Sequence, residues 1–292
     1  MSTSRAFIIA LLCAGCADEP PATAGISCTT PAIAASLPAD IREASGVAFS
    51  ADDPSLLWVH NDSDASPAFH ALRTDGSVRA RFPIPGARAR DWEDLAVGPC
   101  PSGHCLYIGD IGDNLHQRND PAILRLREPA VDHAMAPSPE RFPFRYPNGP
   151  EDAEAMFIMP DTSIYVISKG RSDPVTVYRY PPPLRAGETV LLEQVQQLTP
   201  GLVQLPDFIT GAAARPDGAV IAVRTYSRLR FYRFQDARLV PLAPDSGFDL
   251  THLDEPQGEG VALRQDGTIY LVSESGLEGR PAPLSSMTCR LP

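Results

Sequence analysis

Short runs of apolar residues alternate with polar turns along most of the chain, and the same order of runs and turns returns five times. In each unit a polar, often acidic turn leads into a short apolar run, and a second apolar run ends in another polar turn. We align the units on the first apolar residue after the leading turn, which gives Val47, Leu95, Ala155, Ala212 and Val261. These positions lie 48 to 60 residues apart, a spacing typical of four-stranded β-propeller blades.

The first four units each hold enough apolar runs for four strands. Asp217-Gly218 in the fourth unit and Asp266-Gly267 in the fifth mark tight turns between the first and second strands. In the third unit the fourth run covers residues 190–198. The fifth unit holds only three runs, so we expect residues 26–35 to supply its outer strand. The pattern therefore predicts an all-β fold: a β-propeller of five blades, each of four antiparallel strands, closed by pairing of the N-terminal strand with the C-terminal blade. A sixth blade formed by residues 129–147 or 181–204 is the alternative.

The first residues have the pattern of an export signal rather than of a folded segment. Arg5 precedes an apolar run, residues 6–12, which is too short to span a bilayer. The sequence Cys13-Ala14-Gly15-Cys16 that follows resembles the lipobox of bacterial lipoproteins, in which the second cysteine is lipidated. An ordinary secretory peptide cut near Ala17 is the alternative.

The chain is thus expected to consist of a lipoprotein signal peptide (residues 1–15), a flexible tether rich in Pro and Ala (16–25) and one propeller domain (26–292). We expect the protein to lie in the bacterial cell envelope, on the periplasmic or outer face. Its contact with the membrane would be made through the lipid anchor on Cys16 only.

Charge narrows the choice of partners. The chain has 36 acidic and 25 basic residues and a net charge of −11, so it repels polyanions, and nucleic acid is not expected to bind. We expect a monomer that binds a small molecule or an envelope ligand.

Four cysteines remain outside the signal, an even number that suits an oxidising compartment. Cys28 and Cys289 lie near the two ends of the mature chain, and a disulfide between them would join the termini. Cys100 and Cys105 flank a short hairpin loop that a second disulfide could close. A metal site built from Cys100, Cys105 and His104 is the rival interpretation, but its ligand set is incomplete.

Two stretches carry a resemblance to known proteins. Residues 256–262 (PQGEGVA) and 266–272 (DGTIYLV) resemble the repeat of the superfamily that contains NHL-repeat proteins, gluconolactonase and regucalcin-type lactonases, and phytase-like propellers. Residues 91–96 (DWEDLA) and 109–114 (GDIGDN) resemble most closely those of exported phytase-like propellers. The resemblance implies the propeller fold for nearly all of the mature chain. It leaves the activity open, because this repeat is found in lactonases, phosphatases and binding proteins.

In such a propeller the turn before each innermost strand and the turn after each second strand open on one face, around the central channel. Converging carboxylates repel one another, and a cation relieves that repulsion. Oxygen ligands favour Ca²⁺ or Mg²⁺ over Zn²⁺, and Ca²⁺ is the cofactor we expect. The candidate metal ligands are Glu43, Asp62, Asp94, Asp110, Asp113, Asn114, Glu154 and Glu274.

Other residues at the same face would act on a bound ligand. A cation could polarise an ester, lactone or phosphoester while Glu93 or Glu259 serves as the base. The candidate substrate contacts are Lys169, Arg224, His60 and Trp92. So few basic residues argue against a phytase proper.

The alternative is a non-enzymatic binding or scaffold propeller, and the sequence leaves open whether the protein is an enzyme. An enzyme should have an open cavity with one or two free carboxylates, whereas a scaffold should have a plugged channel with every acid bonded.

Overall fold

The computed structural model describes residues 25–63, 67–132, 135–242 and 247–292. The expected signal peptide, the lipidation site Cys16 and all of the tether except Gly25 lie outside these residues. Within the described ranges, no helix is both long and apolar enough to cross a membrane.

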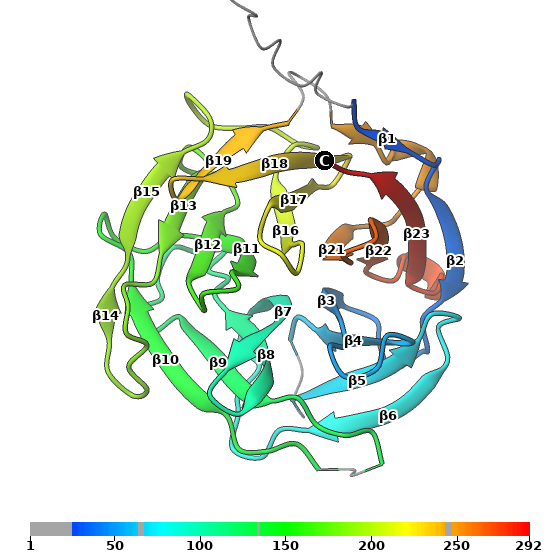
Figure 1. Cartoon of the computed structure of the whole chain (residues 1–292), viewed down its shortest axis with the longest axis horizontal. Coiled ribbons are helices and arrows are strands. Elements are labelled where there is room, and N and C mark those ends of the chain that lie inside the picture. Colours follow the sequence, from blue (N-terminus) through cyan, green and yellow to red (C-terminus); the bar gives the residue numbers. More distant parts are fainter. Residues whose placement is uncertain (1–24, 64–66, 133–134, 243–246) are drawn as a thin grey trace, which may run out of the picture.

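Five antiparallel sheets surround a central axis, as Figure 1 shows. From the axis outward, the first blade contains β3 (Ala44–Phe49), β4 (Leu56–Asn61), β5 (Ala68–Arg73) and β6 (Val78–Pro83). The second contains β7 (Trp92–Cys100), β8 (Gly103–Asp110), β9 (Ala122–Arg127) and β10 (Glu140–Arg145). The third contains β11 (Ala153–Ile158), β12 (Ile164–Ser168), β13 (Thr176–Arg179) and β15 (Glu193–Gln197). The fourth contains β16 (Ile209–Ala214), β17 (Val220–Thr225), β18 (Arg228–Gln235) and β19 (Arg238–Pro241), and β20 (Phe248–Asp249) also pairs with β18.

The fifth blade is completed by the N-terminal segment. Its β21 (Gly258–Leu263), β22 (Thr268–Ser273) and β23 (Pro283–Arg290) come from the end of the chain. The outer positions beside β23 are taken by β1 (Ser27–Cys28) and β2 (Ala32–Ser36). The predicted five-bladed propeller and its closure are therefore confirmed, and in the described residues the segments proposed for a sixth blade form none.

Both predicted disulfides are present. Cys28 lies opposite Cys289 in the β1–β23 pair, and the two form a disulfide across the closure. The other disulfide, Cys100–Cys105, closes the β7–β8 hairpin. Because both hairpin sulfurs are used in this bond, the alternative Cys–His metal site is wrong.

The run at residues 190–198 divides between two blades instead of forming one strand. β14 (Val190–Leu191) pairs in parallel with β10 at the edge of the second blade, and only β15 belongs to the third. The reason is burial: Val190 and Leu192 pack with Phe142 and Phe144 in the core between these blades. Similar apolar clusters fill the spaces between the other neighbouring blades.

Candidate metal centre at the channel mouth

Each innermost strand begins with a β-bulge, and the bulges define one ring of side chains. In all five blades the pairing between first and second strands shifts register near the start of the inner strand. A bulge redirects the side chain of the extra residue. The first residues at the five bulges are Ser45, Glu93, Glu154, Thr210 and Glu259.

The bulges also correct the alignment of the third unit. Glu154 occupies the position of Glu93, so the residue that corresponds to Leu95 is Met156 rather than Ala155. Sequence reasoning placed Glu154 correctly before the strand, but its alignment position, Ala155, was one residue early. An apolar run does not show where a β-bulge lies.

The residues that follow the second strands form a second ring. Each blade has one such residue, directly after its second strand. In four blades the backbone N–H of that residue donates to a carbonyl oxygen of the turn before the inner strand, two positions before the bulge, at 2.8–3.2 Å. These bonds hold the two turns of one blade side by side. The five residues are Asp62, Ile111, Lys169, Tyr226 and Glu274.

The two rings enclose an open cavity of about 460 Å³ at the channel mouth. Its polar lining comes mainly from the rings, and Leu205 and Phe208 add an apolar wall. The lining residues from the rings are Ser45, Glu93, Glu154, Glu259, Asp62, Lys169, Tyr226 and Glu274.

Three carboxylates from the first two blades converge at one side of this cavity. Asp62, Asp91 and Glu93 each offer one oxygen, and the three oxygens lie within 4.8 Å of one another. Burial, together with the charges of Asp91 and Glu154, raises the pKa of Asp62 to about 8. Burial also raises the pKa of Asp91, although Arg118 opposes that shift.

Glu93 and Glu259 are buried among the same group of carboxylates. Burial and the neighbouring Glu154 raise the pKa of each well above the usual range of a glutamate. The pKa of Glu274 is raised by burial and then by Glu43 and Glu154. The cavity therefore concentrates more negative charge than its own residues neutralise.

Lys169, one of the two basic residues that line the cavity, is already paired. Its Nζ lies 2.5 Å from Glu154 Oε1. Burial is the largest single influence and lowers the pKa of Lys169, but Glu154, Tyr226 and Asp152 together outweigh it, so the pKa lies above its usual value. Among the described residues, no basic side chain forms an ion pair with the remaining acids, which are Asp62, Asp91, Glu93, Glu259 and Glu274.

Two carboxylate oxygens in the cavity are buried without a hydrogen-bond partner in the described part of the chain: Asp62 Oδ1 and Glu259 Oε2. The second oxygen of Glu259 accepts from Gln257 Nε2 at 2.6 Å, and the same amide reaches Glu274 at 2.7 Å. The atoms here that could ligate a metal are carboxylate oxygens. The residues therefore fit a hard divalent cation such as Ca²⁺.

Asp94 lies on the channel axis rather than in the cavity. Its carboxylate accepts backbone N–H bonds from Leu95 (2.8 Å), Met156 (2.7 Å) and Ala212 (3.0 Å), which belong to three different blades. Burial raises the pKa of Asp94 well above its usual range, and these three bonds oppose the shift. The residue thus ties inner strands together and has no free oxygen to offer to the cavity.

The other expected ligands lie outside the carboxylate trio. Asp110 pairs with Arg118 at 2.8 Å, and Asp113 accepts the backbone N–H of Arg118 at 2.7 Å. Asn114 lines the cavity, where its Oδ1 accepts from Arg171 at 3.0 Å. Glu43 is exposed.

Three expected substrate contacts are buried outside the cavity lining. Arg224 is fully buried and donates to the carbonyl oxygens of Gly260 (2.8 Å) and Val272 (2.7 Å), and it pairs with Glu255. His60 and Trp92 pack edge to face in the core, with ring centroids 5.6 Å apart. Burial lowers the pKa of His60 to about 4, so its imidazole is neutral near pH 7.

Sequence reasoning left Asp91 of the carboxylate trio and the lining residue Tyr226 out of its candidate set. Asp91 belongs to the acidic stretch that was singled out, but the neighbouring Glu93 and Asp94 were chosen instead. Tyr226 was missed because the second strand of the fourth blade was expected to end at Val223, with Arg224 in the turn after it, whereas β17 runs to Thr225. Alignment with Lys169 and Glu274 would have found Tyr226.

The fold and this cavity define the chain as a five-bladed β-propeller with an acidic channel mouth. No family model matches the sequence, and no curated protein does. The PQQ-bound aldose sugar dehydrogenase of Streptomyces coelicolor is 10% identical with a TM-score of 0.54, over 91% of this chain and 99% of that chain. A glucose dehydrogenase is 12% identical with a TM-score of 0.50, over 88% and 99%. A calcium-binding regucalcin of Agrobacterium tumefaciens is 14% identical with a TM-score of 0.40, over 84% and 75%, which is too low to carry an argument. The likenesses to the two dehydrogenases show the propeller fold alone.

Proposed function

We propose that the protein binds Ca²⁺ in the cavity at the channel mouth and hydrolyses an ester, lactone or phosphoester there. The observation that carries the proposal is the trio Asp62, Asp91 and Glu93, whose oxygens lie within 4.8 Å of one another without a basic partner among the described residues. Like charges at such distances oppose ionisation, and a divalent cation removes that cost.

The trio would hold the cation, and Glu259 would act as the base. A bound Ca²⁺ supplies polarisation of a carbonyl or phosphoryl oxygen. Glu259 keeps one buried oxygen without a partner while Gln257 fixes the other, so this carboxylate is oriented and free to accept a proton from water. The raised pKa of Glu259, caused by burial and then by Glu154, makes the carboxylate a stronger base than an exposed glutamate.

The remaining lining favours an uncharged acyl substrate over a phosphoester. Lys169 is paired with Glu154, and Arg171 is bonded to Asn114 and lies 3.3 Å from Asp152. Neither cation is therefore free for a phosphate. Leu205 and Phe208 would contact an apolar part of the ligand.

We further propose that the protein works as a monomer in the bacterial cell envelope, anchored through a lipid on Cys16. The support is the lipobox-like sequence before Cys16. Labelled palmitate should enter the wild-type protein and not Cys16→Ala; equal labelling of the two would remove the anchor from the proposal.

Calcium titration and a hydrolase screen test the site. Calorimetry on the chelator-treated protein should detect Ca²⁺ binding that Glu93→Gln abolishes and that the exposed-carboxylate control Asp120→Asn leaves intact. Lactone, aryl ester and phosphoester panels should then reveal an activity that needs Ca²⁺. Glu259→Gln should lower kcat by about 10²–10⁴-fold while Ca²⁺ affinity stays within a few-fold.

Two results would contradict the proposal at different points. If Glu93→Gln binds Ca²⁺ as the wild type does, the trio is not the site. If Ca²⁺ binds and no panel is hydrolysed, the hydrolase is wrong and the protein is a calcium-holding binding or scaffold propeller.

A further inference from the structure

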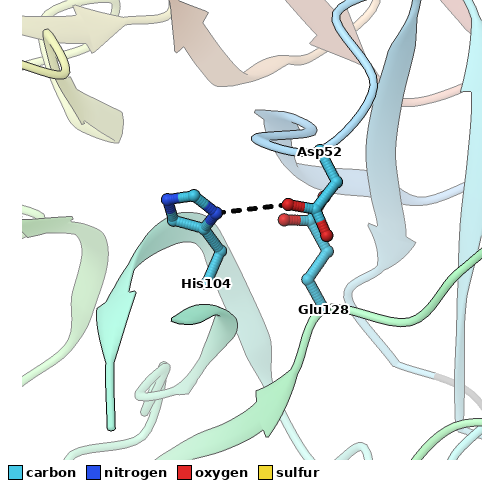
Figure 2. Close-up of side chains that lie close together, drawn as sticks. All are labelled: Asp52, His104 and Glu128. Carbon is cyan, nitrogen blue, oxygen red and sulfur yellow. Dashed lines mark hydrogen bonds and ion pairs between the residues drawn. The ribbon is translucent and has the colours of Figure 1, made fainter. Parts of the chain in front are cut away.

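A second cluster of metal-ligating side chains lies at the end of the first two blades away from the acidic cavity. Asp52 is in the turn between β3 and β4, His104 is in β8, and Glu128 directly follows β9. Each offers one ligand atom, and these atoms lie within 4.8 Å of one another. Figure 2 shows the imidazole of His104 facing the two carboxylates, which lie side by side.

The distance between His104 and Asp52 already fits two ligands of a small tetrahedral ion. His104 Nδ1 lies 3.2 Å from Asp52 Oδ1. Ligand atoms around a tetrahedral Zn²⁺, with bonds of about 2.0–2.1 Å, are about 3.3 Å apart. The side chains of His104 and Asp52 are 49% and 70% exposed, so both can move toward Glu128 without disturbing the core.

Glu128 is the fixed member of the cluster. It is only 5% exposed, and its Oε1 accepts from Ser50 Oγ (2.5 Å) and Trp58 Nε1 (2.7 Å). Its Oε2 accepts only the backbone N–H of Ala51 at 3.3 Å and keeps a lone pair. Neutral donors that hold one oxygen while leaving the other open are the usual support of a carboxylate ligand.

The loop that carries His104 is held in place from two sides. The disulfide Cys100–Cys105 closes the hairpin around it. The backbone carbonyl of His104 also accepts the N–H of Glu128 at 3.0 Å. Two of the three ligands are therefore positioned relative to each other by the backbone, before any ion binds.

The cluster borders a second cavity. A space of about 410 Å³ at this end of the channel is lined by His104, Ser50 and Ala51 and by apolar side chains of the inner strands such as Leu95. An ion held by three protein ligands keeps a fourth position, which a water or a small donor in this cavity can fill.

We propose that Asp52, His104 and Glu128 form a binding site for Zn²⁺, or for a first-row ion of similar preference, that joins the first two blades. One imidazole with two carboxylates is a ligand set for such ions rather than for Ca²⁺, which takes oxygen ligands. The site is separate from the carboxylates at the channel mouth and does not depend on the function proposed for them.

Zinc titration in the presence of saturating Ca²⁺ tests this site on the full chain. The chelator-treated protein should bind one Zn²⁺ by calorimetry, and Co²⁺ at the same site should give visible absorption of a tetrahedral complex. His104→Ala should weaken Zn²⁺ binding by about 100-fold or more, and Ser50→Ala, which removes a hydrogen bond to Glu128 and one from the Asp53 N–H, by about 10-fold. The matched control is His252→Ala, an exposed histidine bonded to the carbonyl of Pro31, and it should bind as the wild type does.

The outcomes separate this site from the cavity at the mouth. Zinc binding that survives in Glu93→Gln and is lost in His104→Ala supports the proposal. Absence of zinc binding in the wild type overturns it, as does unchanged binding in His104→Ala. In either of those cases Asp52 and His104 form a surface ion pair only.

Discussion

The crowded carboxylates at the channel mouth should make the stability of the metal-free protein fall as pH rises. Asp62 shows why stability should fall rather than rise with pH. Its pKa is 3.8 in a free chain and about 8 in the folded protein, so between these values the folded state binds more protons than the unfolded state. Stability therefore decreases with rising pH through that window and is constant, for this group, on either side of it. The interval is about four pH units at about 1.4 kcal/mol each, so the full penalty approaches about 6 kcal/mol.

That value is an upper limit, because Asp62 is half-buried and part of its pKa shift comes from the charge of Asp91, whose own pKa is also raised. Even a third of it, about 2 kcal/mol, is a large part of the total stability of a domain, which is about 5–15 kcal/mol. A cation that binds the ionised trio would oppose the penalty most strongly at neutral and alkaline pH, where the carboxylates have lost their protons.

The assay is thermal unfolding from about pH 5 to pH 8, with a chelator and with Ca²⁺. In chelator, Tm should fall as pH rises, and Ca²⁺ should raise Tm most at the upper end. Asp62→Asn should flatten the slope in chelator and lose the response to Ca²⁺, whereas the exposed control Asp120→Asn should keep both. A Tm that is independent of pH in chelator, or that rises over this window, would refute the reasoning about the cavity.

Three further predictions concern residues away from the cavity. Asp94→Ala leaves the three backbone donors on the axis without their acceptor, so urea unfolding should show a loss of about 3 kcal/mol or more; a loss below about 1 kcal/mol would mean that these bonds contribute little. Arg224→Met leaves the buried carboxylate of Glu255 without its partner, so it should lower the free energy of unfolding by about 3–5 kcal/mol, and a loss below about 1 kcal/mol would mean that the pair contributes little. Replacing Cys28 and Cys289 together by Ser opens a loop of 261 residues and should cost about 2–5 kcal/mol, and unchanged unfolding in the oxidised and reduced proteins would show that strand pairing alone closes the ring.

The number of blades and their closure could be read from the sequence because each depends on a local pattern. Apolar runs of strand length, repeated five times with one strand missing at the end, leave the N-terminal segment as the natural partner for the last blade. The position of Cys28 near the start and Cys289 near the end then agreed with that pairing. Two independent local signals gave the same long-range contact.

Side-chain direction could not be read in the same way. Arg224 and Tyr226 both lie near the end of β17, two residues apart, yet Arg224 is bonded to backbone carbonyls inside the fold and Tyr226 lines the cavity. Tyr226 lies just past the last residue of β17, where the alternation of side chains along the strand no longer holds. The one-residue error at Ala155 has a similar origin, because the β-bulge at Glu154 interrupts the alternation along β11.

The cluster of Asp52, His104 and Glu128 had no sequence signal at all. Its members come from two blades and are separated by 52 and 24 positions, with no spacing that indicates a ligand set. Sequence reasoning paired His104 with the nearest cysteines, which the disulfide removes from consideration. Pairing of β8 with β9 brings Glu128 to His104, and packing of the β3–β4 turn against the second blade adds Asp52.

Asp94 explains how one channel can hold two chemically different ends. Its carboxylate is bonded to the N–H groups of Leu95 and Ala212, which line the apolar cavity, while the preceding residue, Glu93, lines the acidic one. The carboxylate therefore lies between the two cavities and takes up the backbone donors that the inner strands present at the axis. The two ions proposed here would thus lie at opposite ends of the channel, a hard ion with oxygen ligands at the mouth and an ion with an imidazole ligand at the other end, with the bonded Asp94 carboxylate between them.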